Sequence, residues 1–334
     1  MPLVVQVVKI FTGGEGSLQL KHFMVAKSRV AAHLLLHNDI ILEFEYINSE
    51  DVRINHRWSE KQFVDYFLDC YFHVFLSHPG QGQVNRSHKA EPNRDNPWDM
   101  EILLHELERL KGHNGYPFGE FLFDPAFTQN KIKYIETMKE YSIPTLRISL
   151  RLMVGRIPLS VRLEIAAFLA KHGNKCCLKL PFTTNSQALK FPEGGLEDVL
   201  EKLIQFHKLY GDKIHYAILQ PLLPNRKEYK MVFLNGNFSH TAENDKKANP
   251  AFAFGTVESR VSFATEILTV LRQRLPGCLF APLMRFDVMF YDGKMVLNEI
   301  ESLEAQFSGT GDGNVGGFLE KFWVDLLLYW SLHE

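Results

Sequence analysis

The sequence has no excess of charge of either sign. It carries 37 lysine and arginine residues against 39 aspartate and glutamate residues, a formal net charge of −2 at pH 7. A chain this close to neutral has no overall field that would attract nucleic acid or an anionic membrane. We therefore expect neither partner, and any anion that the protein binds must be held by a few local side chains.

Cysteine is scarce, and the spacing of the four residues fits neither a zinc finger nor a disulfide framework: Cys70, Cys176, Cys177 and Cys278. Residues 1–14 lack the basic segment and long apolar run of a targeting sequence and read as a strand. The apolar segment 318–332 is interrupted by charged residues and reads as a packed helix rather than a membrane span. We expect a reducing, cytoplasmic location.

The phosphate-binding loop G-x-x-x-x-G-K-[ST] is absent as well. What is present is the material of an ordinary globular protein, because the 334 residues are 46% hydrophobic and 23% charged. This length is enough for two or three domains with buried cores. A polyphosphate site in such a chain would need lysines from separate strands and a cation held by carboxylates.

Helical and strand patterns alternate along the chain after a long polar segment at residues 78–99. Apolar residues recur at helical spacing in five segments: 99–110, 130–141, 159–173, 195–211 and 257–275. Strand patterns occupy the segments between and after them: 175–182, 215–223, 229–242 and 285–301. This order predicts an α+β fold with antiparallel strands rather than a doubly wound sheet.

Acidic residues stand out in the last strand pair, "RFDVMFYDGKMVLNEIE", which predicts a hairpin around Asp292 and Gly293. Glu299 and Glu301 have the same parity and project from one face, and Asp287 on the partner strand can join them. Acids so close raise one another's pKa unless a cation neutralises them, and hard oxygen ligands suit Mg²⁺. A solvated strand face is the plain alternative, and the apolar residues around the acids argue against it.

The same stretch resembles the closing metal-binding hairpin of the ATP-grasp superfamily, an Arg-x-Asp-Val strand, a turn and a strand ending in Glu-x-Asn. Its sequence is most similar to that of the D-alanine:D-alanine ligases. Further stretches are similar to family motifs in the family's order: "NKIKYIETMKEYSIPT", "KCCLKLPF" and "YAILQPLLPNRKEYKMVFLNGN". The resemblance covers residues 130 to about 310.

The resemblance implies an ATP-grasp fold, in which the nucleotide is held between two α+β lobes after an N-terminal pre-ATP-grasp α/β domain. The implied boundaries are 1–129 for the N-terminal domain and 130–334 for the ATP-grasp domain, with lobes of about 130–220 and 221–334. RimK-like ligases share the pattern of the metal hairpin and of the hinge between the lobes.

The resemblance also implies roles for single residues. Lys131 and Lys179 would contact the nucleotide phosphates, and Glu228 would hold the ribose hydroxyls. The hinge residues would line the adenine: Gln220, Pro221, Leu222 and Leu223. Asp287, Glu299 and Glu301 would hold Mg²⁺, with Mn²⁺ as an alternative. Arg285 would stabilise charge that develops during the reaction.

The activity implied is that of an ATP-dependent ligase that joins a carboxylate to an amine or thiol through an acylphosphate, with a small molecule or peptide as substrate. An inositol-phosphate-type kinase and a non-catalytic nucleotide-binding protein are the alternatives. Three departures from the family pattern keep them open. Glu301 replaces the usual asparagine, residues 183–187 replace a glycine-rich loop, and the usual N-x-x-P-G after the last strand is missing.

Overall fold

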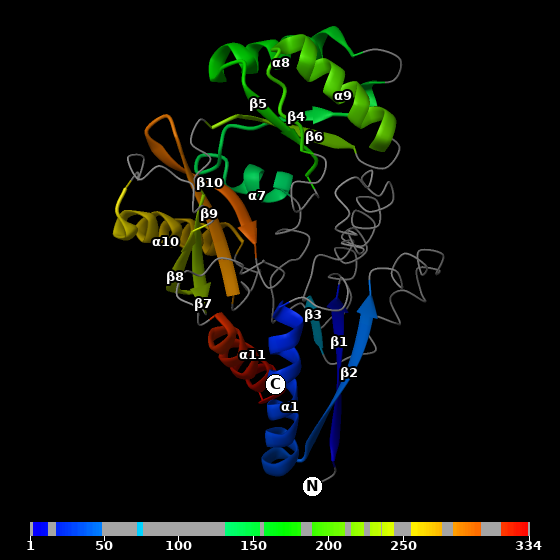
Figure 1. Ribbon diagram of the computed structural model, residues 1–334, viewed down its shortest axis with the longest axis vertical. Helices are drawn as coiled ribbons and strands as arrows, with labels where there is room; N and C mark the ends of the chain where they lie inside the picture. Colours follow the sequence, from blue (N-terminus) through cyan, green and yellow to red (C-terminus); the bar gives the residue numbers. More distant parts are fainter. Residues whose placement is uncertain are drawn as a thin grey trace.

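The computed structural model describes residues 3–12, 18–48, 72–75, 131–153, 157–181, 189–210, 215–223, 228–234, 236–243, 255–275, 283–301 and 315–332. These residues form three sheets, each with its own helices, stacked along the long axis of the molecule (Figure 1). The polar segment 78–99, the helix expected at 99–110 and the departures at residues 183–187 and 302–314 lie outside the described residues.

The N-terminal sheet is parallel, with the strand order β2-β1-β3. Its strands are β1 (Val4–Thr12), β2 (Ile40–Asn48) and β3 (Phe72–Phe75), and α1 (Leu18–Asn38) joins the first two. Parallel neighbours need such a crossover helix. The antiparallel layout inferred from residue 130 onward therefore does not extend to this region, where the parallel strands fit the expected α/β domain.

The last helix, α11 (Val315–Leu332), returns to this N-terminal sheet and packs along α1 (Figure 1). The rings of Phe23 and Trp323 meet edge to face with centroids 5.2 Å apart. The side-chain amide of Gln6 donates to the backbone carbonyl of Ser331 at 3.4 Å. The two ends of the described chain thus share one apolar core.

The small sheet is antiparallel, with the order β4-β6-β5. Its strands are β4 (Leu146–Ser149), β5 (Cys176–Lys179) and β6 (Tyr216–Pro221), and it is accompanied by α8 (Leu159–His172), α9 (Leu196–Tyr210) and a short 3-10 turn at Arg151–Met153. Alternate strand residues such as Ile148, Leu178 and Leu219 pack with the apolar sides of both helices. Cys176 belongs to this core.

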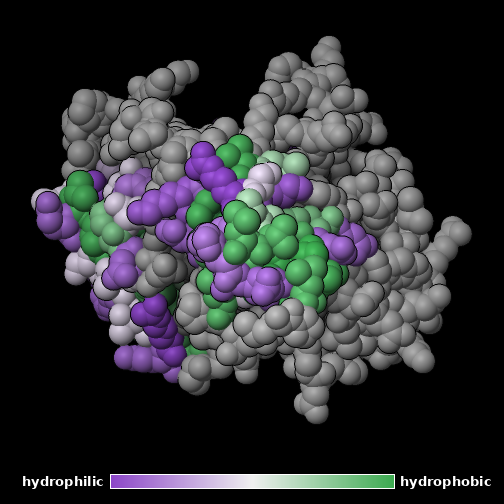
Figure 2. Space-filling view, turned by 90° about the horizontal axis from the view of Figure 1, so that it is seen from below, coloured by the Kyte–Doolittle hydropathy of each residue, from purple (hydrophilic) through white to green (hydrophobic). Residues whose placement is uncertain are grey.

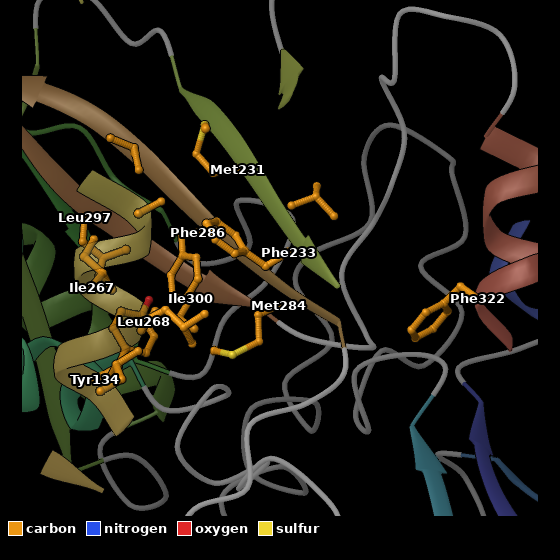
Figure 3. Packing of buried hydrophobic residues seen from close by; sticks show 14 of the residues in the cluster. Tyr134, Met231, Phe233, Ile267, Leu268, Met284, Phe286, Leu297, Ile300 and Phe322 are labelled. Atoms are coloured by element: carbon orange, nitrogen blue, oxygen red, sulfur yellow. The ribbon is translucent and has the colours of Figure 1, made fainter. Parts of the chain in front are cut away.

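The third sheet, called the large sheet here, has four antiparallel strands in the order β10-β9-β7-β8. They are β7 (Tyr229–Leu234), β8 (Asn237–Glu243), β9 (Leu283–Tyr291) and β10 (Lys294–Glu301). Two helices, α7 (Lys131–Thr137) and α10 (Val257–Arg274), pack into the core on one face. Figure 3 shows Phe286, Ile300 and Tyr134 within this core.

Strand alternation explains why the opposite face of the large sheet carries charge. In β7 and β9 the residues that enter the core are Met231, Phe233, Phe286 and Val288, so their neighbours Lys230, Arg285 and Asp287 point the other way. We call this second side the site face. Those three charged residues are nevertheless at most 9% exposed, because other parts of the molecule cover them.

The β9–β10 turn has the conformation that the sequence predicts. Asp292 and Gly293 have φ angles of 49° and 73°, and positive values at both central residues are typical of a two-residue type I′ turn. The helices and strands expected between residues 130 and 301, and the packed helix near the C-terminus, are all found in the described residues.

Apolar side chains also reach the surface at the end of the molecule where β1 begins and α1 ends. Leu3, Val5, Leu35 and Leu36 are each about half exposed or more. Seen from that end, the described surface has an apolar patch beside hydrophilic side chains (Figure 2). No helix among the described residues is long and apolar enough to cross a membrane.

Candidate active site

A β-bulge sets the acids on the site face. From the turn to Leu297 each residue of β10 pairs regularly with β9, with Leu297 opposite Val288. The register then shifts by one residue, so that Glu299 lies opposite Asp287 and Glu301 opposite Arg285. Without this extra residue, Asn298 would face Asp287, and both glutamates would point into the core with Phe286. The bulge is therefore what brings the predicted metal ligands together.

Arg285 and Asp287 form a buried ion pair two residues apart on β9. The Nε and Nη2 groups of Arg285 donate to the two carboxylate oxygens of Asp287 at 2.6 and 2.8 Å. Glu301 forms an ion pair with the same Nη2 group. Burial lowers the pKa of Arg285, but the charges of Asp287 and Glu301 outweigh it, and the pKa lies above its ordinary value. The guanidinium is thus charged and clamped between two acids.

Glu299 is held by two lysines that come from distant parts of the chain. The Nζ of Lys131, at the start of α7, lies 3.0 Å from Glu299 Oε1. The Nζ of Lys179, at the end of β5 in the small sheet, lies 3.8 Å from the same oxygen. One carboxylate therefore joins elements of two sheets, and both predicted phosphate lysines reach the predicted metal ligands.

The charges in this cluster shift one another's proton affinity. Burial raises the pKa of Glu299, but Lys131, Lys179 and Arg285 more than compensate, and the pKa falls to about 2. For Lys131, burial acts downward while the charge of Glu299 acts upward and prevails, so its pKa is raised. Both partners are ionised at neutral pH. The ammonium groups of Lys131 and Lys179 are held beside a carboxylate, in positions from which they can also contact another anion.

Glu228 lies at the edge of the same cluster. The side-chain amide of Asn298, the bulged residue, donates to Glu228 Oε1 at 2.6 Å. Burial, followed by the charges of Asp287 and Glu299, raises the pKa of Glu228 to about 7. This carboxyl is poised between its two protonation states at neutral pH, a property typical of groups at functional sites.

The predicted adenine residues lie at the end of β6 in the small sheet: Gln220 and Pro221 are its last two residues, and Leu222 and Leu223 follow it. Gln220 donates from its side chain to the hydroxyl of Thr145 at 2.8 Å, and the Leu222 amide donates to the backbone carbonyl of Lys175 at 3.0 Å. The Leu223 amide makes no hydrogen bond with another described residue. The Leu223 side chain packs with three buried apolar residues of other elements: Ile143, Met289 and Val296.

The acids fit a divalent cation. Asp287, Glu299 and Glu301 each offer an oxygen, and these oxygens lie within 4.8 Å of one another. Hard carboxylate oxygens in this number are the donors that Mg²⁺ and Mn²⁺ prefer. The adjacent cations neutralise the acids when no metal is bound, which explains how three carboxylates can be so close.

Two residues of this cluster were not identified from the sequence. Asn298 was overlooked because a bulge has no local sequence signal in this strand. Lys230 was overlooked because single lysines are common on surfaces, although its alternation with Met231 within a buried strand was a usable clue. It lies directly opposite Asp287 and is 9% exposed.

Comparisons with known proteins bear on the fold. No protein-family model matches the sequence, and no curated protein does. Among solved structures, D-cycloserine synthetase DcsG aligns with a TM-score of 0.63 and 16% identity, over 97% of this chain and 99% of that one. An ATP-grasp RimK domain protein from Sphaerobacter thermophilus aligns with 0.55 and 13%, over 94% and 98%. The D-alanine–D-alanine ligase of Bacillus anthracis aligns with 0.54 and 11%, over 98% and 97%.

These alignments span nearly the whole of each chain. The protein has the ATP-grasp fold, and the expectation of that α+β fold is confirmed. At such low identity the likeness shows the fold alone. The domain boundaries and the roles of the site residues stay predictions.

Proposed function

We propose that this protein is an ATP-dependent ligase that joins a carboxylate to an amine or a thiol through an acylphosphate. The observation that carries the proposal is the meeting, on the site face, of three acids with cations from three separate elements. The ATP-grasp fold, and the likeness in fold to a D-cycloserine synthetase and a D-alanine–D-alanine ligase, support the same conclusion.

The arrangement of the described residues supports the proposal that the protein binds a nucleotide. The apolar group around Leu223 offers a surface for a purine ring. The Leu223 amide can donate to a ring nitrogen, and Pro221, which has no amide hydrogen, can offer a carbonyl to the exocyclic amine. Glu228 can accept from the ribose hydroxyls, and Lys131 and Lys179 can neutralise phosphate oxygens.

Asp287, Glu299 and Glu301 would hold Mg²⁺ or Mn²⁺, and a cation there supplies charge neutralisation for the phosphates during transfer. To bind it, Glu299 must share or release its two lysines. Those lysines are then available to the phosphates, so that one event prepares both halves of the site. Glu301 adds a negative charge where the family has an amide, and Arg285 balances it.

The chemistry has two steps. An oxygen of the substrate carboxylate attacks the γ-phosphorus, the bond between that phosphorus and the bridging oxygen breaks, and ADP leaves with the electron pair. The amine or thiol then attacks the acyl carbon, loses its proton, and inorganic phosphate departs. Arg285 lies beside the metal ligands, where its charge would stabilise the phosphate oxygens and the oxyanion of the second step.

Hydroxylamine trapping tests the proposal. With Mg²⁺, ATP and a panel of amino acids and short peptides, an acylphosphate yields a hydroxamate and ADP, whereas a kinase yields a stable phosphate ester. Finding only a phosphorylated polyol, with no hydroxamate from any carboxylate, would favour the inositol-phosphate-type kinase. The absence of any nucleotide turnover, with Mg-ATP binding retained, would favour a non-catalytic binding protein.

The residue assignment is tested by the double variant Asp287→Asn, Glu299→Gln. We expect hydroxamate formation to fall by a factor of a hundred or more, since each side chain keeps its shape but loses its charge. Glu201→Gln is the matched control, because it replaces a carboxylate with an amide in the same way but on the exposed side of α9. Near-normal turnover in the double variant would show that the metal assignment is wrong.

A further inference from the structure

Two histidines stand about one helical turn apart near the end of α1. His33 and His37 are both exposed, and their ring centres lie 4.7 Å apart with the ring planes tilted by 48°. The rings meet because residues four positions apart are neighbours on one face of a helix. Neither ring forms a hydrogen bond or an ion pair with a residue that the structure describes. A ligand in solution can therefore reach the ring nitrogens.

The separation of the two rings fits a shared metal ion. A transition metal bonded at about 2.1 Å to one nitrogen of each ring would stand about 3.2 Å from each ring centre. Ring centres 4.7 Å apart then subtend an angle of about 95° at the metal. This angle falls between the right angle of square-planar coordination and the wider angle of a tetrahedron. Two imidazoles at this separation can thus share one ion without a change in the helix.

The position of the pair on the helix also favours a cation. His37 lies in the last turn of α1, where the final backbone carbonyls form the negative end of the helix dipole. One turn before His33, on the same face, Arg29 forms an ion pair with Glu320 on α11. The positive charge of this arginine is therefore balanced by an acid, which weakens its repulsion of a metal ion.

We propose that His33 and His37 bind a transition-metal ion of the class that prefers imidazole, namely Zn²⁺, Ni²⁺ or Cu²⁺. Water would fill the remaining coordination positions, because both side chains are exposed. The pair stands at the end of the molecule opposite the small sheet (Figure 1). It offers nitrogen ligands, whereas the cluster of Asp287, Glu299 and Glu301 offers hard oxygens, so this second site does not depend on the proposed function.

The competing explanation is that two exposed histidines merely pack against each other. Any transition metal that the protein binds would then be held by other histidines of the chain. In that case, a change in the spacing between these two positions would leave the affinity for the metal unaltered. A chelating pair, in contrast, depends on the spacing, because both nitrogens must face one ion.

The test alters this spacing and leaves the composition unchanged. In the double variant Ala32→His, His33→Ala the two histidines are five positions apart and no longer share a face of α1. Ala32 is exposed, as His33 is. Calorimetric titration of the full chain, without a histidine tag and with Mg²⁺ present throughout, measures the affinity for Ni²⁺ and for Zn²⁺. We expect wild type to bind at least about tenfold more tightly than the variant, because the first bond raises the effective concentration of the second ligand.

Thermal unfolding gives a second readout. An ion that binds only the folded chain raises the unfolding midpoint, so Zn²⁺ should raise it more in wild type than in the double variant, and EDTA should reverse the rise. The single variants His33→Gln and His37→Gln each remove one ligand, and they should bind as weakly as the double variant. They decide the comparison if the double variant does not fold.

Equal affinity of wild type and variants for both ions, or no saturable binding by wild type, would overturn the proposal. Hydroxamate formation with Mg-ATP should be the same in wild type and in every variant of the pair, since neither histidine belongs to the acid cluster. A failure of this metal site therefore leaves the proposed function in place, and a protein without ligase activity can still bind the metal.

Discussion

At the scale of single residues, the site is a set of charges that depend on one another. Viewed from the sequence, the three acids repel, so that removing one is expected to cost little. The structure shows each acid holding at least one cation, as Glu299 holds Lys131 and Lys179. Removing an acid therefore leaves a buried cation without its partner, and this cost can outweigh the relief of repulsion. Variants of this site need unfolding measurements beside activity measurements.

Glu228 provides a prediction about pH. Its pKa of about 7 in the folded protein lies above the ordinary 4.5, so its contribution to stability is full below 4.5 and is lost as the pH rises through 7. In protein free of metal and nucleotide, Glu228→Gln should match wild type below about pH 4.5 and be the more stable of the two at about pH 8. Denaturant unfolding at both values measures this.

Glu201→Gln serves as the control, because that side chain is exposed on α9. The glutamine keeps an oxygen that can accept from Asn298, so the hydrogen bond is conserved and the charge is the only difference. A variant whose stability changes with pH in parallel with wild type would contradict the assignment of this titration to Glu228.

At the scale of elements, the β9–β10 hairpin positions most of the chemistry through two local features. The turn at Asp292 and Gly293 sets the register in which β9 and β10 first pair. The bulge at Asn298 then shifts this register by one residue, just before Glu299. The bulge also directs the Asn298 side chain to Glu228. A segment at residues 141–143 pairs with Leu297 on the outer edge of β10. These bonds lie next to the bulge, so they help to hold the shifted register.

Gly293 offers a prediction on the turn. Its φ of 73° is strained for residues with a Cβ, and an added Cβ would meet no atom within 4 Å, so the backbone conformation alone determines the cost. We expect Gly293→Ala to lower the free energy of unfolding by about 1 kcal/mol, and Gly293→Asn to lower it less, because asparagine tolerates this region. Lys294→Ala is the control. An asparagine variant less stable than the alanine variant would contradict the argument.

At the scale of the whole molecule, the last described helix packs beside the first one. Helix α11 follows the large sheet in sequence but packs on α1 of the N-terminal sheet, with Phe23 against Trp323. The N-terminal core is therefore completed only when the last helix is in place. Helix α7 similarly precedes the small sheet in sequence yet packs into the core of the large sheet. For both α7 and α11, the elements that they pack against are therefore not their neighbours in sequence.

Trp323 tests this closure. The residue is 1% exposed, and Trp323→Ala should lower the free energy of unfolding by about 3 kcal/mol or more through lost contacts and the cavity left behind. Leu332→Ala on the same helix, where the side chain is 45% exposed, should change it by less than about 1 kcal/mol. Chemical denaturation measures both changes in stability. Unfolding is followed by far-ultraviolet circular dichroism, because this signal reports secondary structure and does not need Trp323 as a probe. Equal effects would show that α11 does not contribute to the core through Trp323.

The sequence by itself determined the features that depend on near neighbours. Apolar periodicity located the helices and strands from residue 131 to 301, and Asp292-Gly293 located the hairpin turn. Parity placed Glu299 and Glu301 on one face, and the order of weak motifs indicated the ATP-grasp fold that the structural comparisons confirm. The helices, the strands, the turn and the parity are local features, because helix and strand periods and turn conformation are set within a few residues.

Only the tertiary structure decided which residues meet across strands and sheets. Parity fixes a face within one strand but not its offset against the next, so the bulge at Asn298 decided that both glutamates join Asp287 rather than the core. The contacts of Lys131 and Lys179 with Glu299 join residues more than a hundred positions apart, and no local pattern encodes such a distance. The position of Lys230 opposite Asp287 likewise became visible only once β7 was aligned with β9, since burial and cross-strand neighbours are properties of the assembled sheet.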